Sequence, residues 1–256
     1  MPARGSILGV AVDVIGFDEV VRRIERWRAT GERRCIIVTN PHSIMMCRRD
    51  REMMSATRGG ALVLADGVGT TLAFRVLYRM RAVRLPGPEL MLRLFDAGQA
   101  TGLRHFLYGG RPDVLERLCR RLQEKCPKAI ICGSFSPPFR PLSESEDAEV
   151  IEMISKSEPD VVWVGLGAPK QEKWIAAHVG RVGAAALIGV GAAFDFHAGV
   201  VPRAPKWVRR AGLEWLYRLA HEPKRLWRRN LDSLRFLYHV LKQRTFSVQQ
   251  SSRVAE

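Results

Sequence analysis

The sequence has no long hydrophobic run and no leader-like N-terminus. Its longest apolar stretch, from Ala184 to Phe194, is well short of the roughly 20 residues that a membrane-spanning helix needs. The first residues carry one arginine and then an apolar run that Asp13 interrupts, which is unlike a signal peptide. We therefore expect a chain that does not cross a bilayer.

Paired cysteines and metal-binding spacings are also missing. The five cysteines, at positions 35, 47, 119, 126 and 132, are scattered and form no CxxC pair, which argues against zinc or a disulfide framework and favours a reducing cytosol. There is no DxD, no HxxxH and no Walker A loop. The sequence thus predicts neither a metal site nor a bound cofactor.

Short aliphatic runs alternate with amphipathic helical patterns, which is typical of an α/β fold. We expect a Rossmann-like parallel sheet flanked by helices, with a helical C-terminal appendage. Ser143 and Glu146 resemble a capping box, and Pro112 suits the first turn of a helix that ends near Lys125. Strands are expected at 35–39, 61–66, 105–110, 160–167 and 185–191, and a first helix has its apolar face at Phe17, Val20, Val21, Ile24 and Trp27.

Positive charge is concentrated at one end of the chain. The net charge is +15, and residues 201–256 hold 13 Lys and Arg against four Asp and Glu, which indicates a polyanionic partner. We place an α/β core at 1–200 and a basic, aromatic-rich appendage at 201–256. On a helix over 224–242, an aromatic face opposes a basic one; packing on the core, a membrane surface and RNA each account for this pattern.

Three expected strands end in glycine-rich turns. These turns contain Gly109 and Gly110, Gly165 and Gly167, and Gly189 and Gly191. Turns of this kind at the carboxyl ends of strands suit a nucleotide phosphate, although glycine also serves simply to make tight turns. Both GxG pairs lack the third glycine of a dinucleotide fingerprint, since Lys170 and Phe194 stand there.

Polar residues follow the same strands. Asp66 closes one strand and suits a general base, although Asp-Gly is also a common turn pair. Lys170, Gln171 and Glu172 open a helix; they could bind sugar hydroxyls and phosphate, or form a solvated helix N-terminus. Asp195, beside His197, follows another strand and suits either a substrate contact or a structural pair.

Long motifs recur in a fixed order along nearly the whole chain. They are ADG (65–67), GPELM (87–91), YGG, SPPFRPL, PDVVWVGLGAPKQEKW, GVGAAFDFHAG, RAPKW and GLEWLYRLAHEPKRLWRRN. Together they resemble the bacterial WecG/TagA/CpsF glycosyltransferase family, whose members build teichoic acids, enterobacterial common antigen and exopolysaccharides.

The resemblance implies an inverting, metal-independent hexosyltransferase at the cytoplasmic face of the membrane. The donor would be a UDP-sugar carrying N-acetylmannosamine, its uronic acid or glucose, and the acceptor an undecaprenyl-diphosphate-linked sugar. We lean toward an exopolysaccharide-type enzyme, with no nucleic acid as partner. The apolar appendage face would also allow a homo-oligomer off the membrane.

The resemblance also assigns residues. It implies that Asp66 is the base, that Gln171 lies in the substrate site, and that Arg218, Arg225 and Arg228 act in catalysis. Cationic arginines suit a departing UDP whose diphosphate charge needs neutralising. Our full substrate-binding set comprises Thr39, Asn40, Gly109, Gly110, Gly167, Lys170, Gln171, Glu172, Gly191 and Asp195.

The chain departs from the family pattern at two places. The family often has Thr-x-Asn at the end of its second strand, where this chain has Thr39 and Asn40 side by side, and Glu89 stands where relatives often carry Asp. Two other classes of function compete with a transferase. They are a non-catalytic basic module that binds nucleic acid or a membrane, and a Rossmann oxidoreductase or methyltransferase, against which the incomplete glycine pattern argues.

Overall fold

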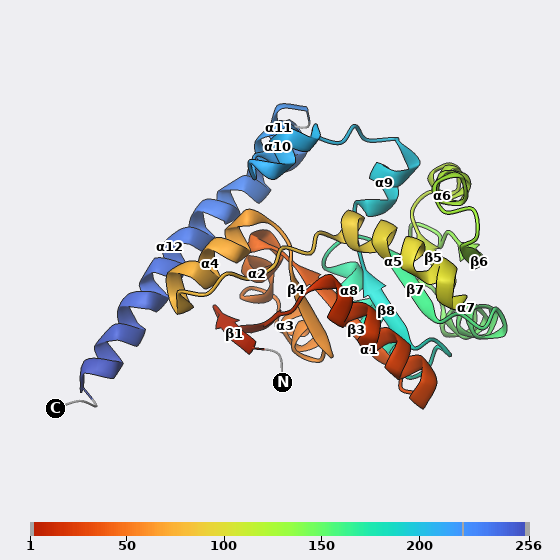
Figure 1. Cartoon of the computed structure of the whole chain (residues 1–256), viewed down its shortest axis with the longest axis horizontal. Coiled ribbons are helices and arrows are strands. Elements are labelled where there is room, and N and C mark those ends of the chain that lie inside the picture. The colour runs from red at the N-terminus through yellow and green to blue at the C-terminus, as the bar shows by residue number, and fades with distance from the viewer. Residues whose placement is uncertain (1–2, 222, 254–256) are drawn as a thin grey trace.

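An eight-stranded sheet forms the centre of the computed structural model (Figure 1). The structure describes residues 3–221 and 223–253, with the backbone alone at 3, 206, 210, 218, 221, 224–226, 228–230 and 246–253. The strands are β1 (Ala3–Ile7), β2 (Val10–Val14), β3 (Arg34–Thr39), β4 (Leu62–Ala65), β5 (Arg104–Gly109), β6 (Ile130–Phe135), β7 (Val161–Gly165) and β8 (Ala186–Gly189).

The order across the sheet is β1-β2-β4-β3-β8-β7-β5-β6. All neighbouring pairs from β2 to β6 are parallel, and only β1 is antiparallel to its neighbour β2. The α/β prediction is therefore confirmed. All strands except β1 run the same way, so their carboxyl ends lie along a single edge of the sheet.

Helices cover both faces of this sheet. They are α1 (Phe17–Thr30), α2 (Pro41–Cys47), α3 (Arg51–Arg58), α4 (Val68–Tyr78), α5 (Gly87–Thr101), α6 (Pro112–Lys125), α7 (Glu144–Lys156), α8 (Lys170–His178), α9 (Ala193–Ala198), α10 (Lys206–Arg210), α11 (Glu214–His221) and α12 (Pro223–Arg253). The helix predicted over 112–125 is confirmed, and so is the capping box of Ser143 and Glu146 at the start of α7.

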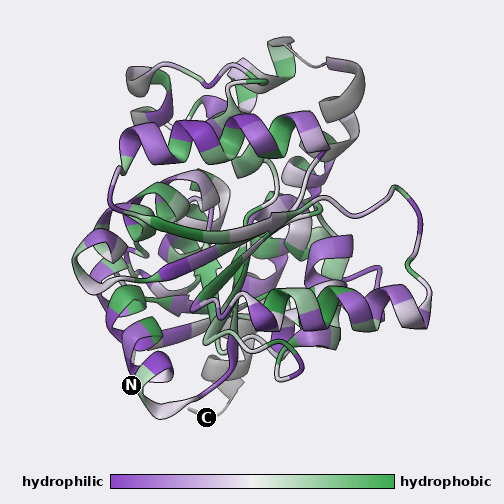
Figure 2. Cartoon of the chain, turned by 90° about the vertical axis from the view of Figure 1, so that its right-hand side faces the viewer, coloured by the Kyte–Doolittle hydropathy of each residue, from purple (hydrophilic) through white to green (hydrophobic). Residues whose placement is uncertain are grey.

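Two hydrophobic cores lie on opposite faces of the sheet because side chains alternate along each strand. On β3, Ile36 and Val38 belong to the core that α1, α5, α6 and α9 complete. Cys35 and Ile37 belong to the core that α2, α3, α4, α7, α8 and α12 complete. Figure 2 shows the apolar strands between helices that alternate polar and apolar positions.

The N-terminal hairpin was not anticipated from the sequence. Strands β1 and β2 meet at a tight turn in which Leu8 and Gly9 both have positive φ. Asp13 is 5% exposed on β2 and accepts hydrogen bonds from Arg4 and from the backbone N–H of Val63. The charge that interrupts the N-terminal apolar run is thus a buried acceptor that joins this hairpin to β4.

Helix α12 packs on α2 and α4 (Figure 1). The face that makes this contact is not the aromatic one. Phe236 and Val240 are buried in the second core. The interpretation in which the aromatic face packs on the core is wrong, because its members are 41–68% exposed: Trp227, Leu231, Leu234, Tyr238 and Leu241. In the part of the chain that the structure describes, no helix has both the length and the hydropathy to cross a membrane.

Candidate active site

Most of the predicted site residues lie at the carboxyl edge of the sheet. Asp66 follows β4, Thr39 ends β3, Gly191 follows β8, Gly167 follows β7, and Gly109 ends β5. The order of these five strands is β4-β3-β8-β7-β5, so these positions form one row along the edge. Parallel α/β sheets bind ligands at this edge.

Asp66 is held at this edge by backbone contacts. Its N–H donates to the carbonyl of Thr39 at 2.7 Å, and its carbonyl accepts from the hydroxyl of Thr70 at 2.9 Å. Gly67 follows with φ of 80° as the residue before α4, a conformation that suits glycine. The Asp-Gly pair therefore makes the turn and also sets a half-buried carboxylate at the rim.

Thr39 and Asn40 have structural partners in the neighbouring turn. The Thr39 side chain is 1% exposed, and its hydroxyl lies 3.3 Å from that of Ser43. Asn40 caps α2, because its side-chain oxygen accepts from the N–H of Ser43 at 3.1 Å. A substrate role for this pair remains a prediction, while their side chains also shape the start of α2.

Gln171 and Glu172 are buried at the start of α8 rather than solvated. The amide nitrogen of Gln171 donates to Glu172 at 2.9 Å, and its amide oxygen accepts from the N–H of Gly191 at 2.9 Å. Glu172 is 2% exposed, its second carboxylate oxygen has no hydrogen-bond partner, and burial raises its pKa. Gln171 therefore joins the turns after β7 and β8.

The glycine turns bring backbone close to backbone. Gly109 has φ of 118°, and a Cβ there would lie 2.8 Å from the carbonyl carbon of Gly165. Only glycine fits this approach. Gly110, the next residue, lies against the ring of Phe194, and its carbonyl accepts from the hydroxyl of Ser136 at 2.7 Å. The two turns thus present closely packed main chain to the edge.

Lys170 lies at the rim, toward a proline-rich loop. Its side chain is exposed, and Nζ lies 5.8 Å from the ring centre of Phe139, which is itself 95% exposed. Arg140 holds this loop by a two-pronged ion pair with Glu146, which, with a bond from the Ser143 backbone, lowers the pKa of Glu146 to about 2. Lys170 therefore remains accessible to an anion.

Asp195 and His197 have different partners in the structure. His197 is buried on α9, and its Nε2 lies 2.8 Å from the carbonyl oxygen of Pro88; burial lowers its pKa. Asp195 is half-buried in the first turn of α9, and its carbonyl accepts from the N–H of Val200. A direct contact of Asp195 with substrate remains a prediction.

Glu89 ties the core to the segment that follows α9. One carboxylate oxygen lies 2.5 Å from Arg203 and 2.6 Å from Arg209. Arg84 donates to the carbonyl of Arg209 at 3.3 Å. Glu89 was recognised in the sequence as a departure from the family pattern, but Arg203 and Arg209 were not identified as its partners. Both arginines lie in the basic segment 201–256.

Three predicted catalytic residues cannot be placed by their side chains. Arg218 lies on α11, and Arg225 and Arg228 lie on α12, but their side chains fall outside the described residues. Among the described residues, no group of three or more His, Cys, Asp or Glu could hold a metal ion. Among the described residues, the edge thus brings together the carboxylates of Asp66, Glu172 and Asp195, the glycine turns and the exposed cation of Lys170.

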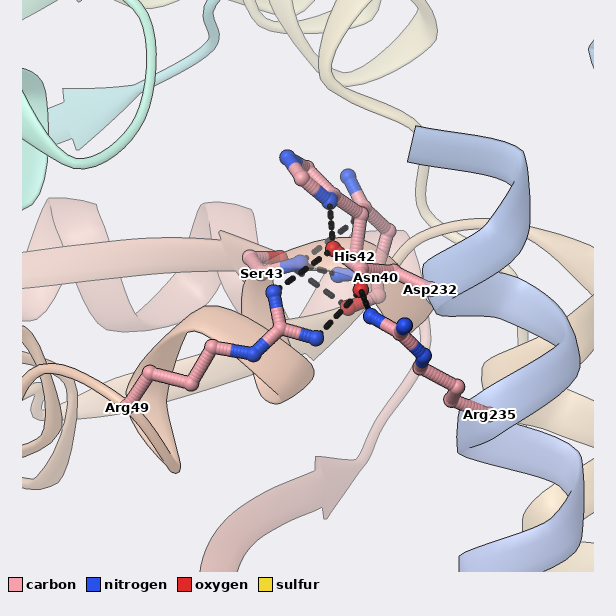
Figure 3. A network of polar contacts seen from close by, with 6 residues as sticks. All are labelled: Asn40, His42, Ser43, Arg49, Asp232 and Arg235. Atoms are coloured by element: carbon pink, nitrogen blue, oxygen red, sulfur yellow. Dashed lines mark hydrogen bonds and ion pairs between the residues drawn. The ribbon is translucent and has the colours of Figure 1, made fainter. Parts of the chain in front are cut away.

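Asp232 anchors α12, the helix that carries Arg225 and Arg228. Asp232 on α12 is 4% exposed and bonds with Arg49, while His42 Nδ1 lies 2.9 Å from its Oδ2 and Arg235 lies at 3.7 Å (Figure 3). Burial alone would raise the pKa of Asp232, but the bonds from Arg49 and His42 lower it. His42 lies two residues after Asn40, so this cluster joins α12 to the rim.

A family model described as the glycosyl transferase WecG/TagA/CpsF family matches residues 5–250. The chain belongs to this family. Similar proteins include the N-acetylglucosaminyldiphosphoundecaprenol N-acetyl-beta-D-mannosaminyltransferase of Bacillus subtilis strain 168, 31% identical over 81% of this chain and 79% of that protein. The protein of the same description from Staphylococcus aureus strain MW2 is 29% identical over 94% of this chain and 93% of its own length.

Membership makes this WecG/TagA/CpsF protein a glycosyltransferase. The expected enzyme class is confirmed, and the non-catalytic module and the oxidoreductase or methyltransferase are not supported.

Proposed function

We propose that the chain transfers a hexose or N-acetylhexosamine from a UDP-sugar to an undecaprenyl-diphosphate-linked sugar during synthesis of a cell-surface polysaccharide. The donor sugar is of the N-acetylmannosamine, N-acetylmannosaminuronic acid or glucose type. The names of the relatives support a lipid-diphosphate acceptor. The observation that carries the proposal is Asp66 at the same sheet edge as the glycine turns after β5, β7 and β8.

The proposed chemistry is a single displacement with inversion. Asp66 accepts the proton of the acceptor hydroxyl while that oxygen bonds to the anomeric carbon. The bond from this carbon to the UDP oxygen breaks on the opposite face, and UDP leaves with the electron pair. Backbone N–H groups of the glycine turns, with Lys170 and Gln171, would bind the donor.

The departing diphosphate needs positive charge, and we assign that task to Arg218, Arg225 and Arg228 in place of a metal. Arg203 and Arg209 are already paired with Glu89, which supports a role in holding the segment rather than in binding UDP. We accordingly propose a catalytic core at 1–200 completed by an appendage at 201–256.

We also propose that the enzyme lies at the inner face of the cell membrane. The exposed apolar row on α12, which includes Leu234, Tyr238 and Leu241, would meet the lipid in which the acceptor resides. Away from lipid, the same row would favour a homo-oligomer.

The test is a panel of UDP-sugars incubated with enzyme and a short-chain lipid-diphosphate sugar acceptor, with UDP release as the readout. One UDP-sugar should be turned over at an unchanged rate in EDTA. Turnover that requires an added divalent ion would contradict the metal-free mechanism. If no UDP-sugar in the panel gives UDP release, the function itself is contradicted.

A further inference from the structure

A basic cavity lies between α2 and α3, away from the catalytic edge. Its volume is about 500 Å³, and its lining includes Arg48, Arg51 and Arg58 together with Ser55 and Met54. All three arginines are exposed, and none forms an ion pair with a described residue. Three guanidinium groups and a hydroxyl are the donors that bind a phosphate group.

The neighbouring carboxylates are committed elsewhere. Asp50 and Glu52 both bind Lys173, at 2.8 and 2.6 Å, and Asp232 binds Arg49. Arg51 also occupies the first position of α3, where a positive charge is unfavourable beside the helix dipole. The cavity is therefore short of negative charge, and a bound anion would relieve the repulsion among its arginines.

The cavity lies alongside α12. Arg58 donates to the carbonyl of Gly9 at 3.2 Å, and Gln243 of α12 accepts from the N–H of the adjacent Leu8 at 2.9 Å. Burial lowers the pKa of His239 on α12, and the charges of Arg48 and Lys242 lower it further. The positive potential of the cavity thus extends to the flank of α12.

The position separates this cavity from the site at Asp66. Asp13 on β2 lies beside Leu64 on the parallel strand β4. Gly9 precedes Asp13 by four residues, so it lies about 13 Å closer to the amino edge of the sheet than Leu64 does. The cavity is therefore toward the amino edge of the sheet. Its arginines are not placed to neutralise UDP at the carboxyl edge.

We propose that this cavity binds the headgroup phosphate of an anionic phospholipid in the bilayer. The inference rests on the proposed membrane location of the enzyme. Lipid is the favoured source of phosphate because the exposed apolar row of α12, with Leu234 at 68% and Tyr238 at 63% exposed, runs along the same helix whose flank carries the basic potential. Acyl chains and a headgroup would meet these two surfaces together.

Vesicle binding tests the proposal on the full chain. The probe is phosphatidylcholine vesicles with and without phosphatidylglycerol, and the variant is Arg48→Gln with Arg51→Gln. Because one Lys or Arg at an anionic surface is worth about five-fold in binding, the variant should bind the phosphatidylglycerol vesicles about 25-fold more weakly. Arg48→Lys with Arg51→Lys keeps the charge and should retain most of the binding.

The matched control is Arg117→Gln with Lys128→Gln, which removes two exposed positive charges at and just beyond α6, on the far side of the molecule from α12 (Figure 1). It should change binding by less than about two-fold, because surface charges act within a Debye length of about 10 Å. An equal loss in the cavity variant and in this control, or no loss in either, would overturn the proposal.

Two further measurements separate the alternatives. Titration with inorganic phosphate at constant ionic strength should show no tight binding; tight binding that the cavity variant loses would mean that the site takes a soluble anion instead. UDP release with a short-chain acceptor in detergent should be the same for the cavity variant and the wild type. If the wild type shows no UDP release, the proposed function fails, whereas the headgroup site is judged by the vesicles.

Discussion

His105 is a histidine that the fold keeps neutral. It is fully buried, stacks on Phe95 with ring centres 4.0 Å apart, and accepts a hydrogen bond from the Trp163 indole at Nδ1. Burial lowers its pKa from 6.5 to about 3. Between these two pKa values, the unfolded chain therefore binds a proton at His105 that the native protein excludes.

This exclusion predicts a loss of stability in acid. Between about pH 6.5 and pH 3, His105 should lower the free energy of unfolding by about 1.4 kcal/mol for each unit that the pH falls. His105→Asn keeps an acceptor for Trp163 and does not titrate, so its stability should fall less steeply. Urea unfolding at pH 6.5, 5.5 and 4.5 measures both slopes; parallel curves would contradict the assignment.

Glu172 makes stability depend on pH in the opposite direction from His105. Burial raises its pKa, so the native state holds the proton more firmly than the unfolded chain does, and stability falls as pH rises from 4.5 through the native pKa. Glu172→Gln should therefore gain stability relative to the wild type on going from pH 4.5 to pH 8, as measured by urea unfolding. Glu116→Gln, on the exposed face of α6, is the control and should show no such gain.

At the scale of elements, the packing of α12 on α2 depends on one buried acid. Removing one partner of a fully buried ion pair costs about 3–5 kcal/mol, and the loss of Asp232 should cost less, because the side chains of Arg49 and Arg235 are 50% and 62% exposed and stay hydrated. Asp232→Asn would leave Arg49, His42 and Arg235 facing one another (Figure 3). Hydrogen exchange of residues 231–245 should become at least ten-fold faster, and sugar transfer should fall with it.

The control for this prediction is Asp113→Asn, which breaks the exposed ion pair with Arg111. Pairs of that kind contribute about 0–1 kcal/mol, so exchange in α12 should not change. Protection of α12 that survives Asp232→Asn would mean that Phe236 and Val240 alone hold the helix.

Elements with a strong local pattern were predictable from the sequence. The helix over 112–125 and the capping box at Ser143 follow from local rules that tertiary contacts do not override. The β1–β2 hairpin was missed because the charge of Asp13 disguised a strand whose carboxylate is satisfied by Arg4 and Val63. Long-range partners of that kind leave no mark on local periodicity.

The candidate site, too, was predictable from the sequence only in part. Strand ends followed by glycine predicted the edge that carries Asp66, Gly109 and Gly167. The burial of Gln171 and the pairing of Glu89 with Arg203 could not be predicted, because they join segments far apart in sequence. Helical periodicity predicted the aromatic face of α12, but it does not tell which face of a helix meets the core.

At the scale of the whole molecule, one exposed row is expected to control contact with lipid. Burying a leucine is worth about 1.5–3 kcal/mol, so Leu234→Asn should weaken binding to vesicles about ten-fold to 100-fold. Its side chain is 68% exposed, so thermal stability should not change. Ile130→Asn, on edge strand β6, is the control; equal losses in both variants would contradict a lipid-facing α12.

The proposed mechanism requires Asp66 to remove the proton of the acceptor hydroxyl at the sheet edge. Asp66→Asn keeps the size and the backbone turn but removes the base. Single-turnover UDP release should fall about 10²–10⁴-fold, with affinity for the UDP-sugar within about two-fold of the wild type. Asp18→Asn, an exposed acid on α1, should have no effect, and an Asp66→Asn rate within about three-fold of the wild type would contradict the claim.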